Sequence, residues 1–426
     1  MVLAPIDPRR EDELRGLLAS MNVAPGRVNP DNALVPFARF DMVHVARFLI
    51  VDDQTTGDVE LYGLLPVAYP RYLAFLGDID GETDAFLTEA VRVAANGLRA
   101  IFACCASFAS HADLLGWMKS HSVAPAANYV NWRGRTVLRV REEAQLHRAL
   151  AAYLRDNRAP LATLSPTALH AALRAFVALE TRAGRLTVSP EGATPLAWWI
   201  GNALHLVGVP LALLLLLPLL LPVALVTLLR LRWLERTDPV RCPPVRDAHE
   251  DALASIEDHD TMNQFTAMGS IKPGLARRWM AISAFFLIDY AARHVFNHGG
   301  LARVRTIHFA RWVFLDGRRR AVFLSNYDGS LESYMDDFIN KVGFGLNVAF
   351  SGGIGYPRTR WLLLDGCHDE RLFKRYLRRH QVPTQVWYNA HPGLTAVDME
   401  RNGRIRQGLD ASSLSEQAAR AWVALL

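Results

Sequence analysis

A single uninterrupted apolar run constrains this chain more than any other feature. Between Gly192 and Leu229 there is no Asp, Glu, Lys or Arg, and Leu206 to Leu229 reads LVGVPLALLLLLPLLLPVALVTLL. As a helix, this run is long enough to cover a hydrocarbon core of about 30 Å. A core helix of a soluble protein seldom carries so many leucines without a polar face. The run therefore predicts that the chain meets a membrane.

The flanks of the run and the prolines inside it bear on how that happens. Tryptophans near the two ends are typical of a membrane interface: Trp198, Trp199 and Trp233. Arginines lie on both flanks: Arg182, Arg185, Arg230, Arg232 and Arg236. Each internal proline tends to kink a helix: Pro210, Pro218 and Pro222. A single span and a bent hairpin are both compatible with this pattern, and positive charge on both flanks favours a hairpin with both flanks in the cytoplasm.

Composition narrows the class of protein around this run. The 426 residues are 51% hydrophobic and 21% charged, with a mean hydropathy of +0.08, which excludes a disordered chain and a polytopic membrane protein. The net charge of +5 suits an anionic membrane surface. No basic run with interleaved aromatic residues occurs, so we expect no nucleic acid partner.

The cysteines and the first residues indicate a reducing compartment. Four cysteines are present, none in a C-x-x-C pair, and the adjacent Cys104 and Cys105 are poorly placed for an ordinary disulfide. The stretch from Met1 to Met21 is rich in charge and lacks the apolar core of a signal peptide. Together with the apolar run, this predicts a protein on the cytoplasmic side of the cell membrane.

Segments on either side of the apolar run resemble each other. VHVARF from Val43 is echoed by IHFARW from Ile307, and Asp80-Gly81 matches Asp328-Gly329 at an offset of 248. Farther along, an offset of 259 pairs His121 with His380, Tyr129 with Tyr388 and Gly134 with Gly393. Matches of this density in the same order predict an internal duplication.

Each copy has the pattern strand, strand, helix, strand, helix, strand. The helices are expected at 83–95 and 112–120 in the first copy, and at 330–342 and 369–380 in the second. This pattern predicts an α+β fold with two ferredoxin-like repeats that face each other as a pseudo-dimeric barrel. Two copies that pair within one chain must lie on one side of the membrane. We therefore expect a membrane-inserted hairpin over 196–233, bent near Pro218 to Pro222.

These observations predict five segments. They are a first ferredoxin-like repeat at 1–160, an amphipathic helix within 161–191, a membrane-inserted segment at 192–236, a polar linker and helix at 237–300, and a second repeat at 301–426.

The paired His-x-Ala-Arg elements are the first candidates for chemistry. On the second, a buried His308 could ligate haem iron, and Arg311 could stabilise a bound peroxide or carboxylate. Alternation along a strand places His308 and Ala310 on one face and Arg311 on the other. The competing interpretation is a core histidine and an arginine that pairs with an acid of its own repeat, Asp80 or Asp328.

The Asp-Gly elements carry a family resemblance. Gly77 to Gly81 has the form G-x-x-D-G, and in the second copy the first glycine is replaced by Ser325. Here the sequence resembles the dye-decolourising peroxidases, which are built from two ferredoxin-like halves and carry this motif beside a haem. The resemblance implies haem and an acid, Asp80, that assists proton transfer to peroxide. The turn alone also explains an Asp-Gly pair.

The chain as a whole is more similar to a group of uncharacterised bacterial membrane-associated proteins. The shared elements are TIHFARW from Thr306, SNYDGS from Ser325 and VPTQVWYNAHPGLT from Val382. This resemblance implies architecture and no reaction.

A further polar group follows the last strand of the second copy. Tyr388, Asn389 and His391 are candidates for the mouth of a cavity, and the first copy has no histidine at the position of His391. We expect Tyr388 and His391 to serve as cofactor-binding residues, with His391 the second choice after His308 as haem ligand.

Three other sequence patterns are explained by a structural role, without a bound ligand or a reaction. His294 and His298 are spaced four apart but fit a helix C-terminus. The acidic stretch around Glu250 and Glu257 fits a solvated face, and GGIG from Gly352 lacks a nucleotide-binding order.

The leading hypothesis is a membrane-associated, peroxidase-like oxidoreductase that uses haem and acts on a lipophilic substrate. The expected catalytic residues are Asp80, Arg311 and Asp328, with His308 as the iron ligand. Two alternatives are a non-catalytic lipid-binding or membrane-scaffold protein and a cofactor-free enzyme acting on lipids or quinones. The expected partners are membrane lipid and a lipophilic small molecule. A homo-oligomer is left open.

Overall fold

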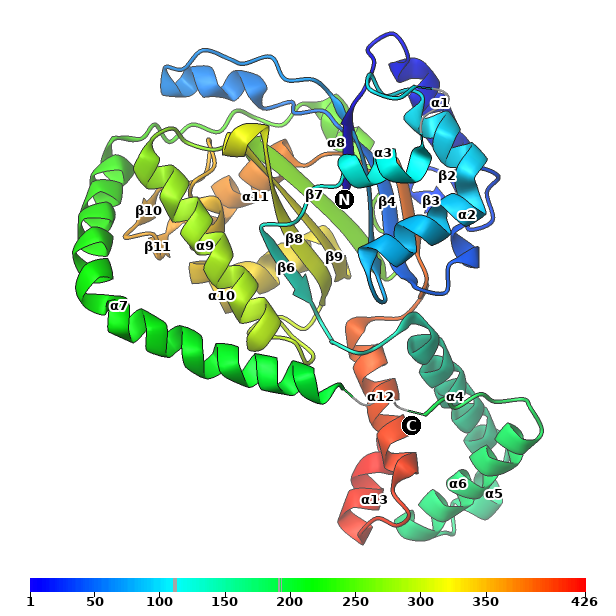
Figure 1. Cartoon of the computed structure of the whole chain (residues 1–426). Coiled ribbons are helices and arrows are strands. Elements are labelled where there is room, and N and C mark those ends of the chain that lie inside the picture. The colour runs from blue at the N-terminus through cyan, green and yellow to red at the C-terminus, as the bar shows by residue number, and fades with distance from the viewer. Residues whose placement is uncertain (110–112, 191, 193) are drawn as a thin grey trace. The chain divides into compact units, whose positions relative to one another are not determined.

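The computed structural model describes residues 1–109, 113–190, 192 and 194–426, which form two compact units. The larger unit comprises residues 1–133 and 195–392 and is a mixed α/β structure with antiparallel sheets. The smaller unit comprises residues 134–194 and 393–426 and is helical (Figure 1). This division differs from the five predicted segments, because the ends of both predicted repeats and the predicted amphipathic helix at 161–191 come together in the helical unit.

The first half of the larger unit supplies the first of two four-stranded sheets. Its elements are β1 (Val2–Pro5), α1 (Glu11–Ser20), β2 (Asn22–Ala24), β3 (Arg27–Val28), η1 (Phe37–Arg39), β4 (Val43–Val51), η2 (Thr56–Tyr62), β5 (Tyr72–Ile79), α2 (Thr83–Phe102), α3 (Leu114–Ser120) and β6 (Ala127–Val130).

The second half supplies the other sheet and the long apolar helix. Its elements are α7 (Leu196–Thr237), α8 (Asp247–Ala254), β7 (Met262–Ser270), α9 (Leu275–His294), β8 (Ile307–Leu315), η3 (Asp316–Arg318), β9 (Arg320–Asp328), α10 (Leu331–Phe350), β10 (Thr359–Arg360), β11 (Leu364–Asp365), η4 (Gly366–His368), α11 (Glu370–His380) and β12 (Val386–Asn389).

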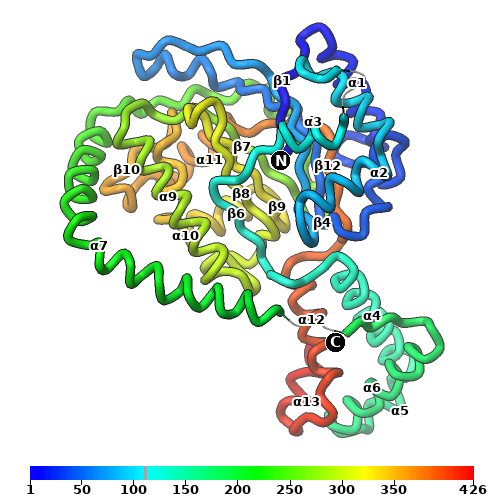
Figure 2. Tube along the Cα trace, in the orientation of Figure 1, coloured from blue at the N-terminus to red at the C-terminus, as the bar shows by residue number. Residues whose placement is uncertain are grey.

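The two halves exchange their last strands. The first sheet has the order β1-β5-β4-β12 and the second has the order β6-β8-β9-β7. β12 therefore completes the first sheet, with Val386 opposite Phe48, and β6 completes the second, with Ala127 opposite Trp312. Figure 2 shows β12 beside β4 and β6 beside β8. Neither half forms its sheet without a strand from the other.

The two sheets match in their backbone hydrogen bonds. After the first strand of each, the amide of Asp7 donates to the carbonyl of Cys104, and the amide of Lys272 donates to that of Gly352, at 2.9 and 2.7 Å. Further matched amide-to-carbonyl pairs are Ala390–His44 with Asn131–His308, and Val123–Met1 with Val382–Thr266. The helices α2 and α10 each contain one non-helical residue, Ala94 and Val342, at the same offset of 248. The halves thus share local geometry as well as element order.

The larger unit has four layers. Between the sheets lies a shared apolar core that includes Leu49, Leu76, Val313 and Leu324. On the outer face of the first sheet, α1, α2 and α3 enclose a second core. On the outer face of the second sheet, α9, α10 and α11 enclose a third. The two four-stranded sheets therefore each lie between two apolar layers, which explains why the central strand β4 is buried along its whole length.

Several predicted helices are confirmed, and the predicted linker is wrong. Helices occur at the predicted positions of α2, α3, α10 and α11, with α2 and α10 longer than expected. The segment expected to be a polar linker contains β7, the first strand of the second sheet. Its polar side chains misled the prediction, because Asn263, Gln264 and Thr266 are buried at 5% exposure or less.

The smaller unit is a helical bundle around its own core. Its elements are α4 (Val137–Asp156), α5 (Arg158–Leu161), α6 (Pro166–Arg182), α12 (Ala396–Asp410) and α13 (Glu416–Val423). The core includes Leu146, Leu173, Ile405 and Trp422. Ser165 caps α6 with its hydroxyl, and Thr395 and Asp398 form a capping box at α12.

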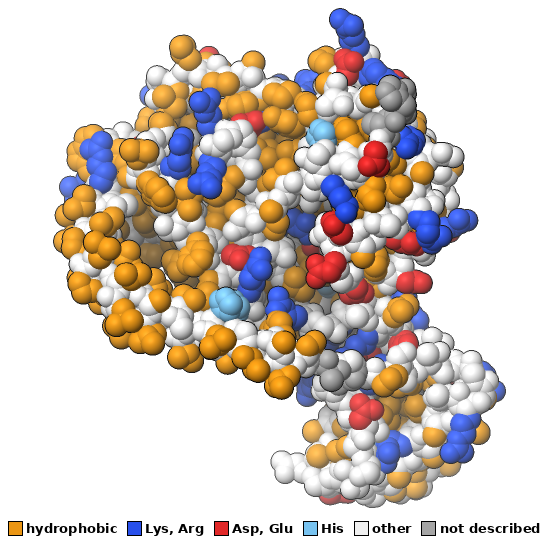
Figure 3. All heavy atoms as spheres, viewed as in Figure 1, with side chains coloured by type: hydrophobic (Ala, Val, Ile, Leu, Met, Phe, Trp, Pro, Cys, Tyr) orange, Lys and Arg blue, Asp and Glu red, His pale blue; other side chains and the backbone are white. Residues whose placement is uncertain are grey.

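The apolar run forms one continuous helix instead of the predicted hairpin. Among the described residues, α7 is the one helix long and apolar enough to cross a membrane, and the most apolar part of it is not buried in the protein. Figure 1 shows α7 as a single curved ribbon, and Figure 3 shows apolar side chains along it. The prolines bend the helix without interrupting it, because its length supplies enough other backbone hydrogen bonds.

Both ends of α7 are held by the larger unit. Near its start, Nδ1 of His294 lies 2.6 Å from Oδ1 of Asn202, and the hydroxyl of Tyr290 donates to the carbonyl of His205 at 2.9 Å. These partners lie in the last turns of α9. At the other end, Asp238 pairs with Arg277 in the first turn of α9.

The contacts at the two ends of α7 require it to bow. Along the chain, His205 and Asp238 are separated by about 50 Å of helix, whereas Arg277 and Tyr290 are separated by about 20 Å. Because α7 is longer than α9 and is attached near both ends of α9, the middle of α7 must bow away from α9. We call α7 with its two anchored ends the arch.

Candidate functional site

Polar side chains gather at one end of the space between the two sheets. At the other end this space is filled by the apolar core that includes Leu49 and Val313. Toward the opposite end, β4, β5, β8 and β9 turn histidines, arginines and acids inward. Most of these side chains are less than a tenth exposed, among them Arg47, Asp78, His308, Asn326 and Asp328. Buried groups of this kind persist only when they are paired, so their partners define what the site can do.

Three side chains form a hydrogen-bonded chain at this polar end. Nε2 of His44 lies 3.0 Å from Oδ1 of Asp80, and Nδ1 of His44 lies 3.0 Å from Nε2 of His391. The amide of His391 donates to the side chain of Asn389 at 2.9 Å. An ionised Asp80 accepts from His44 Nε2, so a neutral His44 accepts from His391 at Nδ1. The chain can therefore pass a proton between His391 and Asp80.

An irregularity in β4 turns His44 into the space between the sheets. The pairing of β4 with β5 shifts register between Val43 and Val45, and β8 has the same irregularity between Ile307 and Phe309. The ring of His44 lies 5.5 Å from that of Phe309 on the opposite sheet. Strict alternation, as predicted for His308, therefore fails at both histidines, because a bulge changes which face a side chain takes.

The second sheet holds the equivalent histidine in a closed pair. Nε2 of His308 lies 2.6 Å from Oδ1 of Asp328, and both side chains are about 5% exposed. This matches the pair of His44 and Asp80, but Asp80 is 25% exposed. The first histidine also reaches His391, so the two otherwise equivalent pairs differ in their surroundings.

The two arginines cross between the sheets. Arg311, on the second sheet, forms an ion pair with Asp78 on the first. Arg47, on the first, bonds to Asn326 on the second. The expectation that each arginine pairs within its own repeat is therefore wrong, because on the inward face the nearest acceptor belongs to the opposite sheet.

Arg47 is held by neutral oxygen atoms. Its guanidinium donates to the carbonyls of Phe265 and Ser325 and to the hydroxyl of Thr266, each at 3.0 to 3.1 Å. Burial lowers the pKa of Arg47 to about 9, with the nearby Asp78 carboxylate acting in the opposite direction. Among the described residues, the centre of the cluster thus contains two arginines, of which Arg311 bonds directly to a carboxylate, that of Asp78.

The structure brings most of the predicted site residues together. Asp80 and His391 lie in one hydrogen-bonded chain, and His308 and Asp328 form a pair in the same inter-sheet space. Tyr388 does not join them, because it points to the outer face of the first sheet and stacks on Phe37 with ring centroids 5.0 Å apart.

Sequence reasoning missed four members of this cluster: His44, Arg47, Asp78 and Asn326. The signal was present in the repeat. His44 occupies the place of His308, and the offset of 248 pairs Asp78 with Asn326.

Haem ligation by His308 does not fit the contacts of its ring. Nε2, the usual iron-binding nitrogen, lies 2.6 Å from Asp328, and the residue is 4% exposed. His391 is engaged through Nε2 with His44. Either histidine would have to give up this partner to ligate iron through Nε2, so we derive no step through haem. Within the described ranges, no group of three or more His, Cys, Asp or Glu side chains is placed to hold a metal ion.

The paired histidines at the end of α9 do not converge either. His294 bonds to Asn202 and stacks on His205, whereas His298 bonds to Asn297. They support the structural interpretation, since one of them anchors the arch.

An apolar pocket lies on the outer side of the second sheet. It has a volume of about 290 Å³ and is bounded by α9, α10, β6 and β8. Its walls include Ile288 and Ala291 from α9, Phe338 and Phe344 from α10, and Trp312 from the sheet. Leu287 and Phe344 are more than half exposed at its rim. The pocket approaches the size of sites for small ligands, about 300 Å³ or more, and its lining suits a lipophilic one.

The pocket lies close to the arch. Tyr290 and His294, which hold the start of α7, lie on α9 next to the lining residues Ile288 and Ala291. Figure 3 shows a hollow between α7 and the rest of this unit, with apolar side chains on both sides. Apolar side chains therefore line both α7 and the nearby pocket.

Comparison of the chain with family models, curated proteins and solved structures found no match in any of the three.

Proposed function

We propose that this protein rests on a membrane surface, inserts the arch into one leaflet and holds a lipophilic molecule in the pocket between α9 and α10. The observation that carries the proposal is α7 itself, whose central part is apolar and fully outside the protein core while both of its ends are tied to one unit. In water this surface would be costly, at roughly 25 cal/mol for each Å² of exposed apolar area.

The anchored ends favour a dip from one side over a span. The two attachment points lie at opposite ends of α9, about 20 Å apart along that helix. A span would have to place them on opposite sides of a hydrocarbon core of about 30 Å, with α9 following through the bilayer. With both ends on one side, only the bowed middle of α7 enters the lipid.

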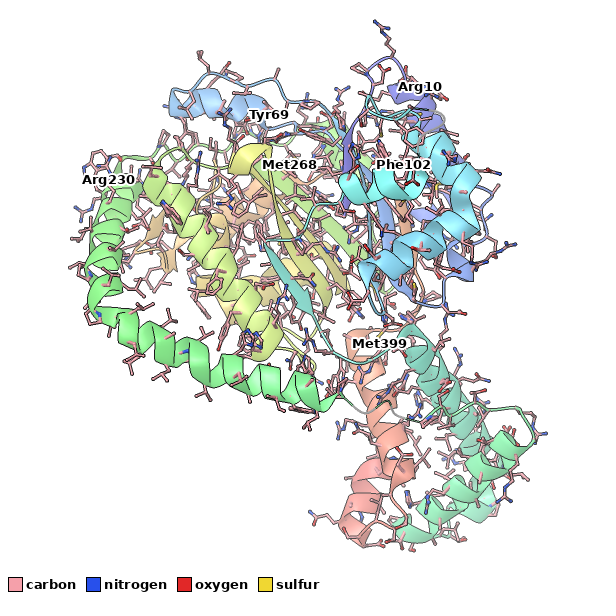
Figure 4. All side chains as sticks on the ribbon, in the orientation of Figure 1. Arg10, Tyr69, Phe102, Arg230, Met268 and Met399 are labelled. Carbon is pink, nitrogen blue, oxygen red and sulfur yellow. The ribbon has the colours of Figure 1, made fainter. Side chains whose placement is uncertain are left out.

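The ends of the arch carry the residues expected at a lipid headgroup layer. Trp199 and Trp233 are each more than half exposed, and the guanidinium of Arg230 lies 4.3 Å from the ring of Trp233. Figure 4 shows Arg230 on the outer side of α7. Tryptophan and arginine at this position anchor a helix at the interface and attract anionic lipid. Arginines on both flanks support the cytoplasmic side of the cell membrane.

We also infer that the two halves of the larger unit descend from one ferredoxin-like repeat. The matched backbone hydrogen bonds, the shared non-helical residue in α2 and α10 and the reciprocal exchange of β6 and β12 support this inference. It explains why the sheets face each other as in a dimer.

Vesicle flotation tests the membrane contact. Full-length protein is mixed with liposomes of phosphatidylcholine and phosphatidylglycerol and centrifuged through a density gradient. The double variant Leu215→Arg/Leu219→Arg places two charges on exposed positions of the arch and should reduce the floating fraction at least tenfold. Val23→Arg, at an exposed position outside α7, is the matched control. Equal flotation of the double variant and the wild type would exclude the arch as the contact.

Labelling distinguishes a dip from a span. Leu196→Cys and Val240→Cys place thiols at the two ends of the arch, both exposed. A membrane-impermeant maleimide added outside sealed vesicles should modify both positions to the same extent. Protection of one position alone would show that the helix spans.

Binding of the fluorescent probe N-phenyl-1-naphthylamine tests the pocket. Gly345 lines the pocket, and a Cβ at this position meets no atom within 4 Å, so Gly345→Phe fills the space without a backbone clash. We expect at least fivefold weaker probe binding. Gly16→Phe is the matched control, since Gly16 also lies on a helix with open space around it. Unchanged affinity in Gly345→Phe would place the lipophile elsewhere.

A second candidate function is an enzyme acting on the same lipophilic molecules. The chain from Asp80 through His44 to His391 supports it, because such a chain can move a proton during a reaction. Mass spectrometry of membrane lipids and quinones incubated with wild type and with His44→Asn tests this candidate. A product formed by the wild type alone supports it, and identical profiles contradict it.

A further inference from the structure

A second cavity, distinct from the apolar pocket, lies where the two sheets end beside η2. Its volume is about 370 Å³, within the range of sites for small ligands. The wall combines Glu11 at the start of α1, Asp52 and Asp53 after β4, Arg71 before β5 and Arg320 at the start of β9. Both halves of the larger unit therefore contribute charged side chains to one cavity.

Arg320 lines this cavity and has one donor without a partner in the described part of the chain. Its Nε donates to Asp316 at 2.6 Å, and Nη1 lies 3.4 Å from Asp53. Nη2 is buried and has no hydrogen-bond partner among the described residues, although the residue is only 1% exposed. A buried guanidinium N–H without an acceptor is costly. A ligand oxygen in the cavity would satisfy it.

The carboxylates of the wall act in the opposite sense, as acceptors. Carboxylates only accept hydrogen bonds, and guanidinium groups only donate them. Asp52 accepts from Arg71 at 3.2 Å, and Glu11 accepts from both Arg71 and Arg15 at 2.7 to 2.8 Å. These acids retain capacity for further donors. A ligand that both donates and accepts at neighbouring atoms therefore fits this wall.

The charge of the wall argues against an ionic ligand. Three carboxylates face two arginines, and the next shell adds one of each, Asp316 and Arg15. The summed formal charge of these side chains stays close to zero. A phosphate would meet the carboxylates, and an ammonium group would meet the arginines.

Apolar groups complete the cavity. Tyr69 lies with its ring 3.9 Å from the guanidinium carbon of Arg320, and Pro8 and Pro70 lie in the same wall. Figure 4 shows Tyr69 on the segment that leads to β5. Flat apolar surface next to paired donors and acceptors matches a ring that carries hydroxyl groups at its edge and C–H groups on its face.

We propose that this cavity binds a neutral polyhydroxylated ring, a monosaccharide or a sugar unit of a larger molecule. The hydroxyl groups would accept from Arg320 and Arg71 and donate to Asp52 and Glu11, while Tyr69 and the prolines cover the face of the ring. The site is independent of the membrane contact and of the apolar pocket.

Saturation-transfer NMR on the full-length protein tests this site with four probes: glucose, galactose, mannose and N-acetylglucosamine. We expect saturable binding of at least one probe at concentrations up to about 10 mM. Arg71→Gln and Tyr69→Ala should each weaken it at least fivefold. Arg15→Gln is the matched control, because Arg15 bonds to the same Glu11 but does not line the cavity.

Each outcome decides the proposal. Loss in Arg71→Gln and Tyr69→Ala with retention in Arg15→Gln supports it, provided that circular dichroism shows all three variants folded. Absence of saturable binding of all four probes overturns it. Binding that is equal in the wild type and both cavity variants places the sugar at another site and also overturns it.

Discussion

The two sheets of the larger unit have the same backbone and different interiors. Lys272 occupies the place of Asp7, and the amides of both make the same hydrogen bond. Asn326 occupies the place of Asp78, and His391 has no counterpart histidine in the first half. The matching backbone maintains the packing of sheet on sheet. The unmatched polar side chains, all buried or partly buried, are where the halves have separate roles.

The outer layers differ as well. The helices over the first sheet enclose a continuous core with Phe86, Leu98 and Trp117. Those over the second sheet leave the apolar pocket and carry both ends of the arch. The comparison indicates that the first half supplies Asp80 and His44 of the polar chain, while the second half carries the exposed apolar surface of α7.

The largest effect on stability is expected when the partners of Arg311 and Arg47 on the opposite sheet are removed. Asp78→Ala leaves Arg311 buried without its carboxylate and should lower the free energy of unfolding by about 3–5 kcal/mol. Asn326→Ala removes one neutral acceptor from Arg47, which keeps three others, and should cost about 1–3 kcal/mol. Urea denaturation followed by tryptophan fluorescence measures both. Equal losses would show that the cluster is symmetric in energy despite its sequence.

A second test uses the buried Lys272. Burial lowers its pKa from 10.5 to about 8 in the folded protein. Between these values the unfolded chain binds more protons, so the free energy of unfolding should rise with pH from 8 to 10.5, by at most about 3 kcal/mol. Lys272→Met should lose this rise, and Asp7→Asn at the matched position should retain it. The measurement is urea denaturation at several pH values, and parallel curves for wild type and Lys272→Met would refute the prediction.

A third test compares the paired histidines. His308→Ala leaves Asp328 buried, with a side chain 6% exposed, and should cost about 2–3 kcal/mol. His44→Ala leaves Asp80 25% exposed to water, which can replace the lost partner, and should cost about 1 kcal/mol. Thermal unfolding ranks the two variants. The reverse order would mean that the chain to His391 contributes more to stability than the closed pair.

The last prediction is that the purified protein contains no stoichiometric haem. Because Nε2 of His308 is bonded to Asp328, we expect detergent-purified protein expressed with iron to show no stoichiometric Soret band. A pyridine haemochrome assay provides the measurement. A stoichiometric band that disappears in His308→Ala would restore the peroxidase-like hypothesis for the second half.

Local patterns in the sequence predicted more than its long-range pairing. The helices α2, α3, α10 and α11 follow from periodicity and from turn residues such as Gly81 and Gly329, both with positive φ. The exchange of β6 and β12 was not predicted, because a strand of four residues does not encode which of two equivalent sheets it joins. The sequence of β7 is typical of a linker, because the inward side chains Gln264 and Thr266 are polar.

The site was predicted in part for the same reason. The repeat identified His308, Asp80 and Asp328, and asymmetry identified His391. The hydrogen bond between His391 and His44 depends on the pairing of β12 with β4. This pairing joins residues more than 330 positions apart in the sequence. The bulges that turn both histidines inward leave no trace in the alternation of apolar and polar residues.

The exchanged strand also sets the order of events while the chain is being made. After β4 leaves the ribosome, its edge waits for about 340 further residues before β12 can pair with it. At roughly 5–20 residues per second this delay is about 17–70 s. During the same interval α7 emerges ahead of α9, which later fixes both of its ends. The nascent chain therefore carries α7 as an apolar helix with free ends until α9 emerges, and only then can the larger unit close over both of those ends.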